Sequence, residues 1–536
     1  MSVEMFKILK IYLNIFVLVN CVLQADENKI IELPKGLTQD EENRIHEIYS
    51  MGRQTDPPIS PVRNIAEFER MEGVLIRYPF GISTELIAEM SEGVTVYCLV
   101  SSNQASSALN TMENGGVIME NVELVIGPTD SYWTRDYGPW WVVDGERNVS
   151  IVDFTYNRPR PNDNDAPLKI SNYLDVTYFA SDIIHAGGNY MTDGVGIAAS
   201  SDLVFNENDL SNEDVMILME DYYGIETYHV IDDPNNTYID HIDCWGKYLS
   251  PTKVLIREVP ESHPQFSMIE ETAEYFSSSL NKWGEPWELY RVWTPNNQPY
   301  TNSLILNEKV FVPTTGGSYD DDAIAVYEEA LPGYEVLGFS GSWQSTDALH
   351  CRTKGIPDLN MLQMFHNPLD HGTDPDENGY RIELIMDDLS EAGIINDSVK
   401  VFYKTIESAV WEFEQLWNLD VPEEPNHWIG WIPALTDSSF IQYYIQGADS
   451  SGRIEKSPLA GWHTFLANPT DACNDWLSGD IDNSGELNIY DILLLADNVS
   501  IGTGSGICSD FVSDINNDST INIVDVIFLV NIIFSI

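Results

Sequence analysis

Short apolar runs alternate with polar breaks from about residue 57 to residue 366 of this chain. Their length, their β-branched and aromatic content and the turn residues between them favour buried strands. The expected strands span residues 73–79, 94–100, 122–127, 149–156, 182–186, 253–258, 303–313 and 334–339.

Segments with a helical spacing of apolar residues stand between several of these runs. Ser83 and Asn212 are suitable N-caps for two of them, because their side-chain oxygens can accept a backbone N–H from the first turn. Strands and helices that alternate along one chain predict a mixed α/β fold. The expected helices span residues 83–92, 212–223, 265–283 and 320–331.

The pattern changes from about residue 380 to residue 468, where short strands recur with turn residues between them. The run 442–449 followed by Ser-Ser-Gly indicates one arm of a hairpin and its turn. A β-sandwich is the architecture that this pattern favours. The expected strands span residues 381–386, 398–403, 428–433, 440–446 and 461–465.

Composition narrows the classes of function. The chain of 536 residues carries 85 Asp and Glu against 27 Lys and Arg, a formal net charge of −58. This charge disfavours nucleic acids and anionic membrane surfaces as partners and favours cations, including cationic substrates and calcium. Since 43% of the residues are hydrophobic, most of the chain should be folded.

The N-terminus predicts export. Lys7 and Lys10 precede an apolar run at 11–23 that is short for a membrane span, and small and acidic residues follow it. We therefore expect a signal peptide at residues 1–25 and a secreted, periplasmic or cell-surface protein.

Six cysteines are too few for a disulfide scaffold in a chain of this length. Cys98 and Cys244 are expected to be buried free thiols, and Cys473 and Cys508, which bracket one acidic loop, are candidates for a disulfide. Cys351 stands apart because His350 and Arg352 flank it, and positive charge would lower the pKa of its thiol.

Polar clusters that follow several strands suggest where a site could form, because loops at strand ends carry functional groups on a rigid scaffold. His241 and Asp243 are one residue apart on an extended segment, which points both side chains to one side. Asp136 lies close to the aromatic ring of Trp133. A thiol at Cys351, a histidine and two carboxylates indicate nucleophilic attack on a cationic group.

At these motifs the chain resembles the guanidine-modifying enzymes. The shared motifs are Trp-Thr-Arg-Asp-Tyr-Gly-Pro at 133–139, Gly-Gly-Asn at 187–189 followed by Asp-Gly, His-x-Asp at 241–243, and the C-terminal Cys351. Agmatine deiminases and the secreted bacterial peptidylarginine deiminases look most similar, over about residues 57–368. The resemblance implies a five-bladed pseudo-symmetric α/β propeller.

The resemblance also implies roles for residues. Asp136 and Asp243 would hold the guanidinium, and Cys351 would attack its carbon. His241 would protonate departing ammonia and then activate water, while Asn302 would complete the catalytic set. The products would be citrulline and ammonia, and neither a metal nor a cofactor is expected in this chemistry.

Arg158 and Arg160 carry the prediction of the substrate. In the bacterial peptidylarginine deiminases that the chain resembles, matching arginines hold the C-terminal carboxylate of the substrate, which agmatine lacks. We therefore expect peptides with a preferably C-terminal arginine, and Trp133 and Tyr238 match pocket-lining positions. Two alternatives remain open: a deiminase of agmatine or free arginine, and a non-catalytic calcium-dependent surface-binding protein.

The last segment holds an internal repeat of acidic loops, each followed by an apolar helix. Oxygen side chains at loop positions 1, 3, 5 and 12, with a carbonyl from position 7, suit calcium. The pairing resembles dockerin modules, which implies a cohesin-like partner. The expected ligands are Asp480, Asp482, Ser484, Glu486 and Asp491 in the first loop, and Asp514, Asn516, Asp518, Thr520 and Asp525 in the second.

The chain thus divides into four expected parts. They are the signal peptide (1–25), a peptidylarginine deiminase-like catalytic domain (57–368), an immunoglobulin-like β-sandwich (375–469) and a dockerin-like calcium-binding module (473–536).

Overall fold

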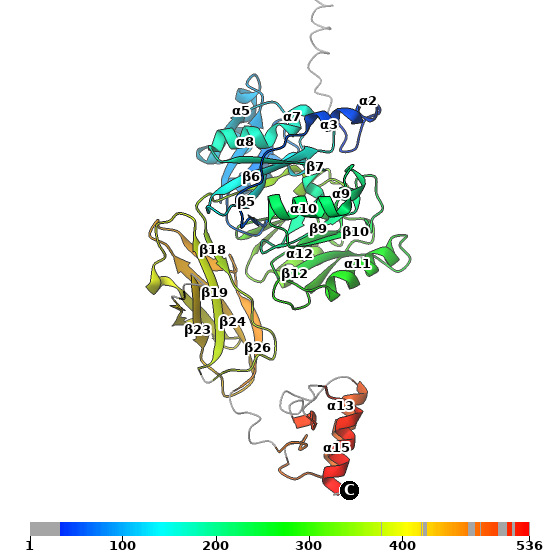
Figure 1. The fold of residues 1–536 in the computed structure, drawn as a ribbon, viewed down its shortest axis with the longest axis vertical. Coiled ribbons are helices and arrows are strands. Elements are labelled where there is room, and N and C mark those ends of the chain that lie inside the picture. Colours follow the sequence, from blue (N-terminus) through cyan, green and yellow to red (C-terminus); the bar gives the residue numbers. More distant parts are fainter. Residues whose placement is uncertain are drawn as a thin grey trace, which may run out of the picture.

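The computed structural model describes residues 33–376, 378–419, 421, 426–469, 477–482, 484–501, 512–516 and 520–534. The predicted signal peptide, the proposed cysteine pair Cys473 and Cys508, and the proposed ligand Asp518 lie outside these residues. Figure 1 shows a mixed α/β region that holds most of the helices, a strand-rich region below it, and a pair of C-terminal helices.

Five separate sheets form the region from Arg63 to Pro357, and its mixed α/β character agrees with the prediction. In neighbour order they are β1 (Arg63–Asn64), β5 (Trp140–Val143), β6 (Val149–Tyr156) and β7 (Tyr178–His185); β10 (Thr227–Ile231), β9 (Ile197–Ser201) and β8 (Met191–Thr192); β11 (Gly246–Tyr248), β12 (Lys253–Glu258) and β13 (Glu288–Trp293); β14 (Leu304–Leu306), β15 (Lys309–Thr314) and β16 (Glu335–Ser340); and β17 (Lys354–Pro357), β2 (Met71–Arg77), β3 (Thr95–Val100) and β4 (Val122–Ile126).

All five sheets repeat one strand pattern. An antiparallel pair (β5 and β6, β8 and β9, β11 and β12, β14 and β15, β17 and β2) is followed by a parallel neighbour of its second strand. Helices lie in the crossovers between the parallel strands, as parallel pairing requires. They are α4 (Thr84–Ser91), α5 (Ala105–Asn114), α7 (Pro161–Asn164), α8 (Ala166–Leu174), α9 (Leu203–Asn206), α10 (Asn212–Tyr223), α11 (Phe266–Ser278) and α12 (Asp320–Ala330).

The fifth sheet joins the two ends of this region. β17 pairs with β2 in antiparallel register, with Lys354 opposite Leu75. Side chains from both ends of the region, including Leu75 and Ile356, pack into one buried core. The last strand therefore completes a sheet that the first strands begin.

Short helical turns lead into the first strand of the antiparallel pair in four sheets, and these turns position the site. They are α6 (Thr134–Tyr137) before β5, η3 (Gly187–Asn189) before β8, η4 (Ile242–Cys244) before β11 and η5 (His350–Arg352) before β17. Turn α6 packs against η3 and η5, and η3 packs against η4. In the remaining sheet, Asn302 lies at the corresponding position, just before the first strand β14.

Most predicted elements form, with local differences. Ser83 caps α4 as expected, whereas the cap of α10 is Ser211, whose hydroxyl accepts the N–H of Asp214, rather than Asn212. Helix α11 ends at Ser278, because Asn281 closes a turn with Glu285 instead of continuing the helix. The single strand expected at 303–313 is a hairpin of β14 and β15.

Two antiparallel sheets make up the strand-rich region, and their inward side chains share one core. Along β19 alternate residues are buried, as a half-buried strand requires. The predicted hairpin arm is β24, which pairs with β25. The strands are β18 (Leu362–Phe365), β19 (Tyr380–Asp388), β20 (Lys400–Thr405), β21 (Glu412–Gln415), β22 (Trp417–Asn418), β23 (His427–Ile432), β24 (Ser439–Ala448), β25 (Ile454–Ser457) and β26 (His463–Ala467).

Short helices begin and end the described chain. Helices α2 (Gln39–Asn43) and α3 (Ile48–Met51) precede the first sheet, with the turn η1 (Ile45–Glu47) between them. Helices α13 (Ile489–Ile501) and α15 (Ile523–Phe534) pack against each other near the C-terminus. Within the described ranges, no helix has the length and apolar character needed to cross a membrane.

Candidate active site

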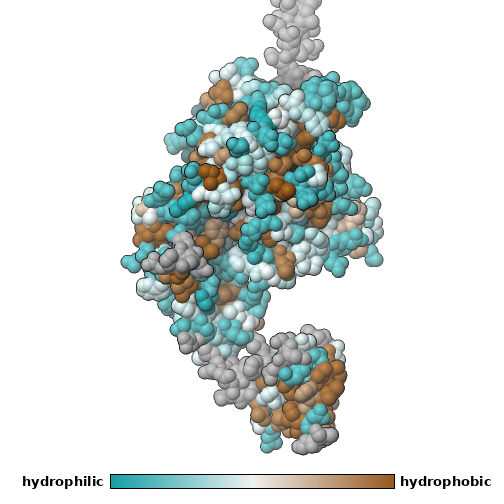
Figure 2. Space-filling model, in the orientation of Figure 1, coloured by the Kyte–Doolittle hydropathy of each residue, from teal (hydrophilic) through white to brown (hydrophobic). Residues whose placement is uncertain are grey.

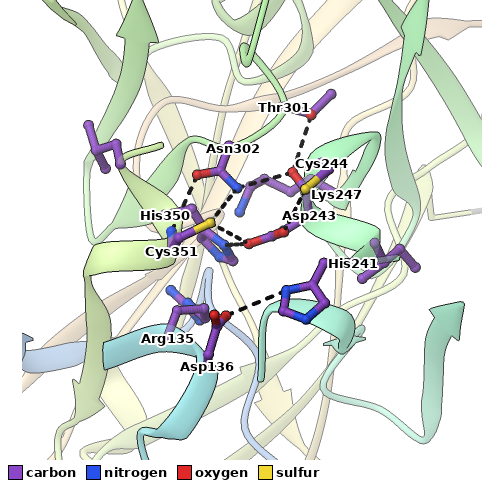
Figure 3. A network of polar contacts seen from close by, with 12 residues as sticks. Arg135, Asp136, His241, Asp243, Cys244, Lys247, Thr301, Asn302, His350 and Cys351 are labelled. Carbon is purple, nitrogen blue, oxygen red and sulfur yellow. Dashed lines mark hydrogen bonds and ion pairs between the residues drawn. The ribbon is translucent and has the colours of Figure 1, made fainter. Parts of the chain in front are cut away.

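The structure brings the five predicted catalytic residues together in one buried place (Figure 3). Cys351 lies in η5, Asp243 in η4 and Asp136 in α6, while His241 caps η4 and Asn302 stands just before β14. None of the five is more than 3% exposed. Water is therefore largely excluded from the place where these groups meet.

Asn302 brackets the thiol of Cys351. Its side-chain oxygen accepts the backbone N–H of Cys351 at 3.3 Å, and its Nδ2 donates to Sγ at 3.2 Å. The same Nδ2 lies 3.4 Å from the backbone oxygen of Asp243. Asn302 thus links the turn that holds the nucleophile to the turn that holds one of the carboxylates.

The environment of the thiol differs from the prediction. The guanidinium of Arg352 is paired with Asp347, and both ring nitrogens of His350 face carboxylates. Burial, followed by the charge of Asp243, raises the pKa of the Cys351 thiol far above its usual value. The expectation that His350 and Arg352 make this thiol acidic is therefore wrong.

Asp243 is held by a buried chain of contacts. Its Oδ2 lies 2.8 Å from Nδ1 of His350, whose Nε2 lies 2.7 Å from Glu67. Glu67 also pairs with Arg135 at 2.6 Å and with Lys247 at 2.7 Å. Burial alone would raise the pKa of Asp243, but the contact with His350 and the charge of Lys35 hold it below its usual value.

Asp136 and His241 have unused hydrogen-bonding capacity. Nδ1 of His241 lies 3.6 Å from Oδ1 of Asp136, which is too long for a strong hydrogen bond. This oxygen and both ring nitrogens of His241 are buried without a hydrogen-bond partner. Because such atoms are costly to bury, they mark a place suited to a polar ligand.

The pKa values of these two side chains are shifted in opposite directions. Burial raises the pKa of Asp136 to about 6, with Lys35 opposing the rise and Asp243 adding to it. Burial and the charge of Lys35 lower the pKa of His241 well below its usual value, although Asp243 opposes this. His241 is therefore a neutral base in this structure, and Asp136 is ionised at neutral pH.

Gly188 gives these groups room. A Cβ added there would lie 2.5 Å from Oδ1 of Asp136 and 2.6 Å from Nδ1 of His241. The next residue, Asn189, accepts the backbone N–H of Ile242 at 3.2 Å and so fixes the turn that carries His241. In the Gly-Gly-Asn motif, Gly188 thus leaves space for Asp136 and His241, and Asn189 holds the turn through a backbone hydrogen bond.

Arg158 and Arg160 lie beside the pocket, where both contact a segment near the N-terminus. Nε of Arg158 donates to the backbone oxygen of Lys35 at 3.3 Å. Arg160 donates to the backbone oxygens of Pro34 at 2.7 Å and Gly36 at 3.1 Å. The two arginines therefore bind main-chain carbonyls in this structure.

The two predicted aromatic residues take different positions. Trp133 is buried, and the guanidinium carbon of Arg160 lies 5.4 Å from its ring centre. Tyr238 is 68% exposed and covers Gly36, since a Cβ there would lie 2.8 Å from its ring. Trp133 thus supports an arginine, whereas Tyr238 lies over the N-terminal segment.

Some residues of the site lie outside the motifs described above. Lys35 donates to Sγ of Cys351 at 2.7 Å, although 316 positions separate them. Glu67 lies in no recognised motif. Gly188 does lie in one, and a glycine pair between clustered polar residues could have indicated a close approach. Cys98 and Cys244 are buried free thiols, as predicted.

A thiol that faces two carboxylates in a dry pocket suits nucleophilic attack on a carbon that carries positive charge. Residues 67–357 match the family described as Porphyromonas-type peptidyl-arginine deiminase. This span is more than half of the chain, and the chain belongs to that family. It is a deiminase-family hydrolase that acts on guanidino groups.

Relatives and solved structures agree with this assignment. A Legionella pneumophila protein named "Putative agmatine deiminase" is 26% identical over 299 residues, which cover 50% of this chain and 82% of that protein. The agmatine deiminase of Enterococcus faecalis has 17% identity and a TM-score of 0.50, covering 57% of this chain and 99% of that one. The "Putative Arginine Deiminase" of Porphyromonas gingivalis has 18% identity and a TM-score of 0.50, covering 55% and 98%. At these identities the two structures support the fold alone.

A second candidate site lies in the C-terminal loops. Carboxylate oxygens of Asp480, Asp482 and Asp491 lie within 4.8 Å of one another. Oxygens on opposite sides of a calcium ion are about 4.6–5.2 Å apart, so these three residues fit that ion. Asp480 and Asp491 are almost fully buried.

The two loops share a local structure. Asp491 accepts the backbone N–H groups of Ile481 at 2.9 Å and Asn488 at 2.8 Å. Asp525 accepts those of Ile515 at 3.0 Å and Asn522 at 2.9 Å, the equivalent positions of the second repeat. The final carboxylate of each loop thus ties its two ends together.

Proposed function

We propose that the protein hydrolyses the guanidinium group of arginine in peptides, giving citrulline and ammonia through a covalent intermediate on Cys351. The observation that supports a peptide substrate is the binding of main-chain carbonyls by Arg158 and Arg160 beside the pocket. These arginines would donate hydrogen bonds to the backbone carbonyls or to the C-terminal carboxylate of a peptide, and agmatine has neither group.

Asp136 and Asp243 would hold the guanidinium. The unpartnered Oδ1 of Asp136 can accept an N–H, and charged pairs of this kind are roughly twice as strong as neutral hydrogen bonds. The planar guanidinium can donate hydrogen bonds to two carboxylates at once in a fixed geometry. An ammonium group matches this geometry less well. This arrangement would face the carbon of the guanidinium toward Sγ of Cys351.

The raised pKa of Cys351 shapes the first chemical step. The thiol proton passes to neutral His241 as Sγ bonds to the guanidinium carbon, and the bound cation favours the developing thiolate. Protonated His241 then gives this proton to one amino group, and the C–N bond breaks to release ammonia. The product of this half is a cationic amidino-thioether on Cys351.

The second half uses the same histidine as a base. Neutral His241 takes a proton from water while the water oxygen bonds to the carbon, and the C–S bond then breaks. Citrulline leaves, and Asn302 lies within 3.2 Å to support the departing sulfur. Protonated His241 gives its proton to the sulfur, which restores the resting thiol and the neutral histidine, and the protonated ureido group loses its extra proton to solvent.

We further propose that the five sheets form a five-bladed pseudo-symmetric propeller. The repeated strand pattern and the pairing of β17 with β2 support this arrangement. We propose an immunoglobulin-like domain after it, supported by two sheets around one core. Export by the N-terminal 25 residues, to the exterior, the periplasm or the cell surface, completes this proposal.

For the C-terminal module we propose structural calcium and a cohesin-like protein partner. The cluster of Asp480, Asp482 and Asp491 supports calcium, which would link the ends of each loop. Figure 2 shows hydrophobic side chains gathered over α13 and α15. Equivalent residues of both repeats are exposed there: Ile489, Tyr490 and Leu493, and Ile523, Val524 and Ile527. A repeated apolar surface of this kind suits protein binding.

Agmatine or free arginine is the second candidate substrate class. It is favoured by the name of the Legionella relative. The third hypothesis, a non-catalytic calcium-dependent surface-binding protein, is disfavoured by the complete set of Cys351, His241, Asp136 and Asp243 in one pocket.

A substrate panel separates these candidates. The full-length chain is offered agmatine, free arginine, a peptide with C-terminal arginine and a peptide with internal arginine, and the ureido product is measured. We expect the C-terminal peptide to have the highest kcat/KM. Arg158→Ala should raise the KM for that peptide relative to the KM for agmatine, with the exposed Arg381→Ala as matched control.

Two results would contradict the proposal. Turnover that survives Cys351→Ala would exclude the covalent mechanism. If agmatine is the best substrate and Arg158→Ala does not affect peptides, the peptide assignment is wrong; equal rates for internal and C-terminal arginine would remove the C-terminal preference.

A further inference from the structure

A lysine from the N-terminal segment, residues 33–44, fills the pocket in which a substrate guanidinium would react. Nζ of Lys35 donates to Sγ of Cys351 at 2.7 Å and to the backbone oxygen of Thr346 at 2.8 Å. It also lies 4.0 Å from Oδ2 of Asp136. Lys35 is only 4% exposed, so the cation is enclosed by the site.

The position of this nitrogen along its side chain matters. Counted in bonds from Cα, Nζ of lysine stands where Cζ stands in arginine. Lys35 therefore places Nζ where the reacting carbon of an arginine would lie, next to the sulfur that would attack it. An ammonium group has no electrophilic carbon, so this occupant cannot be converted.

The backbone around Lys35 is held like that of a bound peptide. Arg158 donates to the carbonyl of Lys35, and Arg160 donates to those of Pro34 and Gly36. Gly36 fits closely, since a Cβ would lie 2.8 Å from the ring of Tyr238. The residues expected to select the substrate are thus engaged by the chain itself.

A small helix secures the segment just after the pocket. Thr38 and Glu41 form a capping box at the start of α2, and Glu41 is paired with Nε of Arg160 at 2.7 Å. Gln39 and Asp40 on this helix are exposed. The segment therefore has a specific anchor on Arg160 and a solvent-facing side that other proteins can reach.

We propose that residues 33–44 are a built-in competitor of the substrate, with Lys35 in the place of the reacting arginine. This inference rests on the proposed deiminase function of the same site. A substrate must displace the segment before it can reach Cys351 or use Arg158 and Arg160.

Kinetics of Lys35→Ala in the full chain test the competition. We expect the KM for a C-terminal arginine peptide to fall by about tenfold or more, with little change in kcat. If the segment leaves the pocket open in fewer than about a tenth of the wild-type molecules, the apparent affinity for the peptide is reduced by that same fraction, and removing Lys35 restores it. Lys35→Met, which keeps most of the side chain without charge, should act in the same direction. Gln39→Ala, on the exposed side of α2, is the matched control and should not change KM. An unchanged KM in both Lys35 variants would overturn the proposal.

Lys35→Arg gives a direct chemical readout. This variant places a guanidinium against Cys351, so we expect the mass change of citrulline formation at position 35, at a rate independent of enzyme concentration. The same variant with Cys351→Ala should stay unmodified. Absence of conversion at position 35 in a protein that deiminates added peptides would contradict the assigned position of the segment.

A third measurement does not require turnover. Alkylation of Cys351 by iodoacetamide, followed by peptide mapping, should be faster in Lys35→Ala than in wild type, because the gain in access outweighs the rise in the pKa of the thiol that loss of the ammonium causes. Equal alkylation rates would overturn the competitor proposal. If alkylation accelerates but no variant, Lys35→Arg included, forms a ureido product, the competitor is supported and the deiminase function is wrong.

Discussion

His350 holds the carboxylate of Asp243, with 2.8 Å between its Nδ1 and Oδ2 of the acid. The other ring nitrogen reaches Glu67 at 2.7 Å. His350 is thus a positioning residue: it orients a carboxylate proposed to bind the substrate and is itself fixed by Glu67, a partly buried acid. Its position next to Cys351 in the sequence does not reveal this role.

Two amide substitutions of His350 separate its two contacts. Asn places its nitrogen near the position of Nδ1 and Gln near that of Nε2, so His350→Asn should keep the contact with Asp243 and His350→Gln that with Glu67. We expect His350→Gln to lose about 10- to 100-fold in kcat/KM, the usual cost of a hydrogen bond to a charged group, mostly through KM. His350→Asn should lose less. Equal losses, measured with folding checked by circular dichroism, would show that the contact with Asp243 is not the important one.

Gly188→Ala should disable the site without unfolding the protein. The added methyl would lie 2.5 Å from Oδ1 of Asp136 and 2.6 Å from Nδ1 of His241, so at least one of these groups must move. Displacing a group aimed at the reacting atoms costs about 100-fold or more in kcat. Gly93→Ala is the control, because its Cβ would have nothing within 4 Å. A near-normal kcat in Gly188→Ala would show that the reaction does not depend on the present positions of Asp136 and His241.

The pH dependence should report Asp136. Its pKa is raised to about 6 by burial, with Lys35 opposing the rise. Only the ionised carboxylate attracts a guanidinium, so kcat/KM should fall as the pH drops through about 6. A bound guanidinium favours the ionised form, so the acid limb of kcat should lie at lower pH than that of kcat/KM.

The Lys35→Ala variant provides the check on this assignment. Removing the ammonium removes a charge that holds the pKa of Asp136 down, so the acid limb of kcat/KM should move to higher pH. Rates measured between about pH 5 and pH 8 cover the transition. An acid limb that does not move, or moves to lower pH, would assign it to another group.

Calcium should stabilise the C-terminal module and leave deimination unchanged. Asp491 is fully buried and lies beside Asp480 and Asp482, so it is the carboxylate most suited to an ion. A ligand at 100 times its Kd adds about 2.7 kcal/mol to the free energy of unfolding, which a chelator would remove. We expect two thermal transitions, of which only that of the module depends on calcium. Asp491→Asn should abolish this dependence, and the exposed Asp397→Asn should not.

Initial deiminase rates measured with and without a chelator complete this test. A large loss of initial rate on chelation, with the α/β region still folded, would contradict a purely structural role for calcium.

The main parts of the site could be predicted because each functional side chain lies in a turn just before a strand. Asp136, Asp243 and Cys351 all precede the first strand of an antiparallel pair, so polar clusters next to apolar runs mark them. The chemistry of one thiol, one histidine and two acids then restricts the reaction. Local pattern and residue type indicated these residues, and the resemblance to the guanidine-modifying enzymes supplied their expected roles.

Other features depend on partners that are distant in the sequence. Nothing near Lys35 indicates Cys351, which is 316 positions away. The positive charge next to Cys351 suggested an acidic thiol, but sequence adjacency gives neither the direction of a side chain nor its burial. Burial then raises the pKa instead of lowering it.

The hairpin at 304–314 shows a missed turn. Asn307 has a φ of 54°, a left-handed conformation that asparagine adopts more readily than most residues. Its side chain also bonds both backbone groups of Met71, at 2.8 and 2.9 Å. The polar pair Asn307-Glu308 in an apolar run was the available sign of this turn.

The pairing of β17 with β2 bears on when the enzyme becomes competent. Cys351 lies on the turn just before β17, so its position depends on that strand docking against one made about 280 residues earlier, a long loop closure that is slow compared with local folding. A partly synthesised chain therefore has acids and a histidine but no placed nucleophile. The architecture delays the chemistry until the whole α/β region has folded.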